Sequence, residues 1–192
     1  GVGFGPVTVS AARFAAPLVD PLTRDGWTGD ETAKQATTTL ATLDFGDGAS
    51  GLYDFTDNQW HNQLLMRRLL VRGTLGELRD QDVVRLAADR TIVRSSIVRR
   101  QTGYDLDLDG FDTDHLTFGS DVLYRNPYQG QRWNDEEIAI ATLLADMASW
   151  VDGDGPEPYP LADGCHDHAI ALAIEAAAKT ATAVRVGEQP WS

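Results

Sequence analysis

Two stretches in the last third of the chain repeat their apolar residues at the period of an α-helix. The first stretch, about 134–152, opens with Asn134 and Glu137 at the spacing of a reciprocal N-terminal cap. Its apolar positions fall three or four residues apart, so we expect one side of this helix to be covered: Ile140, Leu144, Met147 and Val151.

The second stretch, about 161–180, predicts a helix that lies close to another surface. Its alanine run at 176–178 would allow a close approach. One face would carry Leu161, Cys165, Ala169, Leu172 and Ala176. Between the two helices, Gly153 ends the first, and three prolines at 156, 158 and 160 keep the connection extended.

Upstream of the helices, about 5–126, the pattern alternates between apolar and polar residues as in β-strands. The segment Gly46–Gly48 separates two alternating runs and predicts a hairpin turn. Strands first and helices last indicate an α+β fold. We therefore predict a large, mostly antiparallel β-sheet with helices packed on one face, forming a single domain over residues 1–192.

Composition narrows the class of partner. The chain has 16 basic and 29 acidic residues and a net charge of −13, which argues against nucleic acid or an anionic membrane as partner. One cysteine allows no internal disulfide and fits a reducing compartment, so we expect a cytoplasmic protein. No apolar run is long enough to span a membrane, and no secretion leader is visible.

Three polar segments could line a site. Gln59, Trp60 and His61 belong to a run suited to a hydroxylated ligand, although an exposed sheet edge is an equal alternative. Arg132 could hold a carboxylate or phosphate, or pair with a carboxylate in the first turn of the first helix. The run 165–168 carries two histidines that point roughly 200° apart on a helix, so we predict no metal site there. It forms either a polar patch facing a cleft or an ordinary solvated helix start.

Four short motifs, in this order, resemble a known family: VRGTLGE at 71–77, NPY at 126–128, DEEIA at 135–139 and YPLAD at 159–163. Nearly the whole chain, about 5–191, is similar to the C-terminal domain of the glucose–fructose oxidoreductase, inositol dehydrogenase and rhizopine-catabolism family (Gfo/Idh/MocA). The resemblance implies a broad antiparallel sheet with helices on one face. It also implies a homodimer through the open sheet face, and enzymes that use NAD or NADP on sugars, cyclitols and related alcohols.

The chain departs from this family in its catalytic parts. The nucleotide-binding Rossmann half and the E-K-P motif with the catalytic lysine are both absent from the sequence. We therefore assign no catalytic residue and expect no cofactor to bind this chain alone. By resemblance, the substrate-positioning candidates are Gln59, Trp60, His61, Arg132, Tyr159 and His166.

Two other functions stay open at this stage. The chain could be a free-standing module for ligand binding or assembly. It could also be a cofactor-independent lyase, isomerase or cyclase with His61, His166 or an aspartate as its base. The length of the native polypeptide separates these hypotheses, because the oxidoreductase hypothesis requires a further domain upstream.

Overall fold

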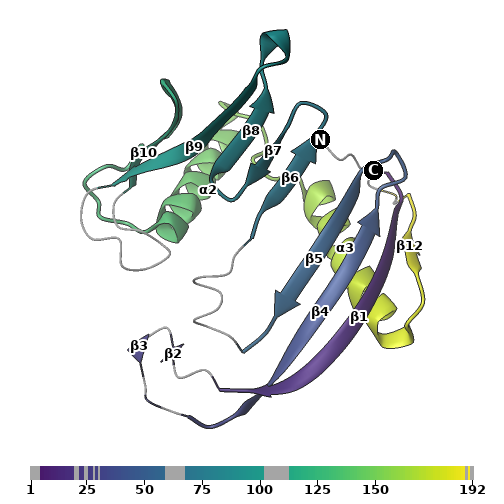
Figure 1. The fold of residues 1–192 in the computed structure, drawn as a ribbon. Helices are drawn as coiled ribbons and strands as arrows, with labels where there is room; N and C mark the ends of the chain where they lie inside the picture. The colour runs from purple at the N-terminus through teal and green to yellow at the C-terminus, as the bar shows by residue number, and fades with distance from the viewer. Residues whose placement is uncertain are drawn as a thin grey trace. The chain divides into compact units, whose positions relative to one another are not determined.

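The computed structural model describes residues 5–19, 22–23, 26–27, 29, 31–58, 68–101, 113–188 and 190. It has the predicted α+β class, with antiparallel strands and two α-helices (Figure 1). The chain divides into two compact units. Unit 1 comprises Gly1–His61 with Glu157–Ser192, and unit 2 comprises Asn62–Pro156.

Unit 1 contains a four-stranded antiparallel sheet in the order β12-β1-β4-β5. The predicted turn at Gly46–Gly48 joins β4 to β5, and both glycines have positive φ angles, of 77° and 92°, a region that side chains disfavour. A short ribbon of β2 and β3 and the helix α3 complete the unit. The bounds are β1 Val7–Leu18, β2 Leu22–Thr23, β3 Gly26–Trp27, β4 Lys34–Asp44, β5 Ser50–Thr56, α3 Leu161–Thr180 and β12 Val184–Val186.

Helix α3 lies against one face of this sheet (Figure 1). Its two fully packed residues are small. Ala173 and Ala177 are buried against Val7, Val9 and other residues of the sheet. Alanine side chains let the helix backbone approach the valines closely, which a longer side chain would prevent.

The predicted contact face of α3 is wrong by about one position. Leu161 and Leu172 are 76% and 56% exposed, whereas the buried stripe consists of His166, Ala173 and Ala177. Of the predicted face, Ala169 does pack against the core, together with Ile170 and Ile174. The sequence reading also missed β12, which pairs with β1 through only three residues.

Unit 2 contains a six-stranded antiparallel sheet in the order β11-β10-β9-β8-β7-β6. Helix α2 begins after Asn134, whose side chain accepts the amide of Glu137 while the Glu137 carboxylate accepts the amide of Asn134, both at 2.9 Å. The predicted reciprocal cap is therefore confirmed. The bounds are β6 Leu70–Gly73, β7 Gly76–Arg79, β8 Asp82–Leu86, the short helix η1 Ala88–Arg90, β9 Ile92–Gln101, β10 Thr113–Phe118, β11 Asp121–Arg125 and α2 Asp135–Val151.

The apolar side of α2 is open, contrary to expectation. Ile140, Leu144 and Val151 are 53%, 63% and 74% exposed, and Ile138 is the buried residue of this helix. Polar contacts in its first turn, described below, connect this helix to β9 and β10.

The strands do not form the one large sheet that we predicted. Among the described residues they lie in sheets of four and six strands with a separate two-stranded ribbon. An alternating pattern identifies a strand and its buried side but does not specify its neighbours, which explains the difference. Within the same residues, neither α-helix is both long and apolar enough to cross a membrane.

Candidate functional site

Gln59, Trp60 and His61 lie outside the described residues, but the residues just before them are placed. The Asp57 carboxylate accepts the backbone N–H of Thr37 at 2.6 Å. The Asn58 amide nitrogen donates to the carbonyl oxygen of Gln35 at 2.7 Å. Both bonds fasten the end of β5 to the start of β4, so these two polar side chains have structural partners.

Tyr159 lies just before α3 and contacts its first two turns. Its hydroxyl donates to the Asp167 carboxylate at 2.7 Å. Its ring passes over Gly164, where a Cβ would lie 3.3 Å from the ring. The hydrogen bond to Asp167, some desolvation, and the negative charges of Asp167 and Asp163 raise the pKa of Tyr159. This exposed phenol therefore stays protonated over the physiological pH range.

His166 lies on a different side of the same helix. His166 is only 8% exposed, and it belongs to the buried stripe with Ala173 and Ala177. Adjacent helical residues point about 100° apart, so His166 does not join the Tyr159–Asp167 pair. Cys165 is half-buried on this turn. No group of three potential metal ligands occurs among the described residues.

A polar cluster that the sequence reading missed joins the sheet of unit 2 to α2. Thr113, 3% exposed, donates to the Asp135 carboxylate at 2.8 Å. The Arg99 guanidinium donates to that carboxylate at 2.9 Å and to the Thr113 hydroxyl at 2.6 Å. The three side chains come from β10, α2 and β9. The signal in the sequence was the position of Arg99 on the half-buried side of an alternating strand.

Neighbouring residues complete this cluster. The buried Asn126 amide donates to the Thr113 carbonyl at 2.8 Å and accepts the Tyr128 N–H at 2.9 Å. Partial burial, followed by the charge of Asp135 and by Tyr128, raises the pKa of Tyr124. Arg132 is exposed and has a positive φ of 59°. The Asp135 carboxylate, one of the partners suggested for Arg132, is held by Arg99 and Thr113.

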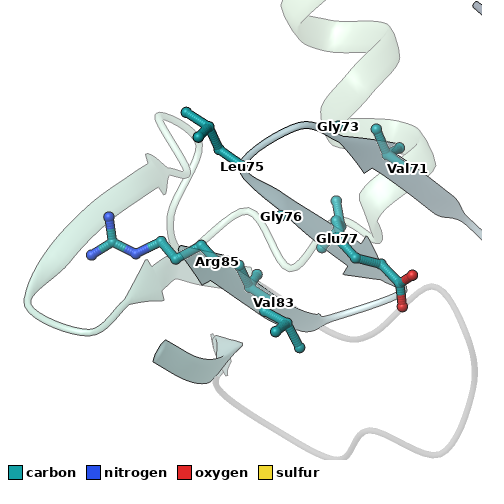
Figure 2. Close-up of a pocket in the computed structure, with 9 residues that line it drawn as sticks. Val71, Gly73, Leu75, Gly76, Glu77, Val83 and Arg85 are labelled. Carbon is teal, nitrogen blue, oxygen red and sulfur yellow. The ribbon is translucent and has the colours of Figure 1, made fainter. Parts of the chain in front are cut away.

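A hollow lined by described residues lies elsewhere in unit 2, on the strands β6, β7 and β8 (Figure 2). Its volume is about 310 Å³, and apolar and glycine residues dominate its lining. Glu77 and Arg85 also line it, but their side chains extend in different directions (Figure 2). Its described lining therefore lacks the converging polar groups that orient a small ligand.

The described candidates thus lie in two separate local arrangements: Tyr159 beside Asp167 with His166 on another side of α3, and the Arg99–Thr113–Asp135 cluster near Arg132. Comparison of the chain with known protein families, curated proteins and solved structures found no match.

Proposed function

We propose that this chain is the substrate-side and assembly domain of an NAD(P)-dependent oxidoreductase acting on sugars, cyclitols or related alcohols. In this proposal, two copies associate through the open face of the four-stranded sheet. The observation that carries the proposal is the set of large apolar side chains on the face opposite α3. The enzyme class rests on the family resemblance of the four sequence motifs.

The open face follows directly from the strand register. Val9 and Ala41 face α3, so the intervening positions of β1 and β4 face away from it. Phe14, Leu40 and Leu52 occupy such positions and are 57%, 37% and 77% exposed. Alanine, serine and threonine residues lie around them, with Asp54 directly opposite Leu40, and a face rich in small residues is suited to packing against a second sheet.

The motifs that carry the resemblance occupy defined structural positions. VRGTLGE forms the β6–β7 hairpin, in which Arg72 and Glu77 form an ion pair at 2.8 Å. NPY supplies the buried Asn126, DEEIA begins α2, and YPLAD begins α3 with Tyr159 bonded to Asp167. The motif residues thus have local structural roles, and the exposed substrate-side candidates among the described residues are Tyr159 and Arg132.

The described residues do not fit a dinucleotide cradle. Such a cradle needs parallel strands that lead through a glycine-rich turn into a helix, and every described strand pair is antiparallel. We therefore assign these residues no step of hydride transfer. In the proposed enzyme, the nicotinamide cofactor would bind the nucleotide-binding half.

A free-standing assembly module is the second candidate, favoured by the same apolar face together with the lack of converging polar groups in the described hollow. The two candidates differ in the length of the native polypeptide. The intact mass of the natural protein tests them, because the oxidoreductase requires a further domain and the free-standing module does not.

Association through the open face is tested by sedimentation of the chain and two matched variants. Leu52→Ser removes the most exposed apolar side chain of the face, and Leu161→Ser removes an equally exposed leucine on α3. Burying a leucine contributes about 1.5–3 kcal/mol, and a two-fold interface contains each residue twice. We expect Leu52→Ser to weaken the dimer by roughly 100-fold or more and Leu161→Ser to leave it intact. A monomer at micromolar concentration, or equal effects of both changes, would contradict the proposal.

A further inference from the structure

Three positively charged or titratable side chains form a row across the six-stranded sheet of unit 2. His115 of β10 lies directly opposite Arg100 of β9 on one side and Arg125 of β11 on the other. Directly opposite residues in antiparallel strands share a face of the sheet. Both arginines are exposed, and the His115 side chain between them is 20% exposed.

Elsewhere on the same face of the sheet, one carboxylate pairs with two arginines. The register places Arg94, Glu77 and Arg72 on the face that carries Arg100, because Arg94 lies opposite Val84, Val84 opposite Glu77 and Glu77 opposite Arg72. There, Glu77 bonds Arg72 at 2.8 Å and Arg79 at 3.1 Å. These arginines lower the pKa of Glu77, chiefly through the hydrogen bond from Arg72.

The row of Arg100, His115 and Arg125 differs from the pairs that Glu77 forms. Within the described ranges, neither Arg100 nor Arg125 has a carboxylate within ion-pair distance. Asp114, the residue before His115, is engaged with the Nδ1 atom of His115 at 2.8 Å. The chain has 29 acidic residues, so this unbalanced pair is not explained by a shortage of carboxylates.

We propose that Arg100 and Arg125 form a binding site for the phosphate group of a small molecule, held above His115. Neighbouring strands lie roughly 4.8 Å apart, so the two arginine backbones are about 10 Å apart and their long side chains can converge on one group between them. Two guanidinium groups match a dianionic phosphate in charge, and each can donate two parallel hydrogen bonds to its oxygens. Asp114 holds the imidazole ring that separates them.

The overall negative charge of the protein does not prevent phosphate binding at these two arginines. The net charge of −13 repels anions at long range, but salt at physiological concentration screens charges beyond about 8 Å. The local pair of arginines therefore determines binding at this position.

An NMR titration of the chain with inorganic phosphate at constant ionic strength tests the proposal. Amide shifts should saturate and be centred on Arg100, His115 and Arg125. Arg100→Gln and Arg125→Gln should each lower the phosphate affinity by about fivefold or more. The matched control is Arg94→Gln, which removes an exposed arginine from the same strand and the same face, and it should change the affinity by less than about twofold.

Acetate, with a single charge, provides the second arm and should bind more weakly than phosphate. A thermal melt of each variant checks that it is folded. Shifts that do not saturate, equal losses in Arg94→Gln, or equal binding of acetate would overturn the proposal. Self-association that protects these amides without any phosphate response would overturn it as well.

Discussion

Gly76 offers a sharp test of how the β6–β7–β8 hairpins are packed. A Cβ at this position would lie 2.4 Å from the carbonyl oxygen of Val84 and 3.0 Å from the Cα of Arg85. Both atoms belong to the backbone of β8, which cannot turn aside as a side chain can. Gly76→Ala must therefore push β7 away from β8 at the pair Gly76–Arg85. Gly73 of β6 lies directly opposite Gly76, and a Cβ at Gly73 would lie in open space.

The expected cost combines overpacking with weakened strand pairing. Overpacking typically costs about 1–3 kcal/mol, and a weakened hydrogen bond adds roughly 0.5–1.5 kcal/mol. We expect Gly76→Ala to lower the free energy of unfolding of unit 2 by about 2–3 kcal/mol. Gly73→Ala should be neutral or raise it by about 0.4–1 kcal/mol, because alanine restricts the unfolded chain.

Urea denaturation, followed by a probe within unit 2, measures both values. For a unit of this size, 1 kcal/mol corresponds to about 4–8 °C in Tm, so Gly76→Ala should lower the melting temperature by roughly 10–20 °C. The reasoning fails if the free energy of unfolding of Gly76→Ala lies within about 0.5 kcal/mol of the value for the natural sequence. It also fails if Gly73→Ala is destabilised as much as Gly76→Ala.

Two further predictions concern the helix starts. Asp167→Asn should lower the pKa of Tyr159, because it removes the charge that stabilises the protonated phenol. The measurement is tyrosinate absorbance against pH, and the difference between the two proteins isolates Tyr159 from the other four tyrosines. Since the folded pKa lies above the ordinary value of 10.0, this contribution to stability is complete below that pH and is lost as the pH rises through the folded value. An unchanged titration would exclude the Asp167 carboxylate as the cause of the raised pKa of Tyr159. Asn134→Ala should destabilise unit 2 by about 1 kcal/mol in urea denaturation, whereas Asn134→Asp, which keeps an acceptor, should cost much less; equal losses would contradict the role of the side-chain oxygen.

The sequence predicted features that depend on neighbouring residues. The α2 cap needs only Asn134 and Glu137, three positions apart, and the β4–β5 turn needs only the glycines at 46 and 48, so both predictions are confirmed. The helices also begin and end within a residue or so of their expected limits. The partner of Asp135 could not be found in this way, because Arg99 lies 36 positions earlier and reaches it only through the sheet.

The candidate site shows the same limit. The sequence could select Tyr159 and His166 by residue type, but only the helix geometry places one beside Asp167 and the other on the buried stripe. Likewise, alternation identified the strands, but their register decides which side chains become neighbours, as with Arg100 and Arg125 on either side of His115.

For this protein, then, the sequence by itself determined the α+β class, the helix limits and the local caps and turns, because these depend on propensity and short-range hydrogen bonds. The tertiary structure decided the division into two sheets, the alanine contact of α3 and the groups gathered around Asp135. Those depend on backbone distances between segments far apart in the chain, which a residue pattern does not encode.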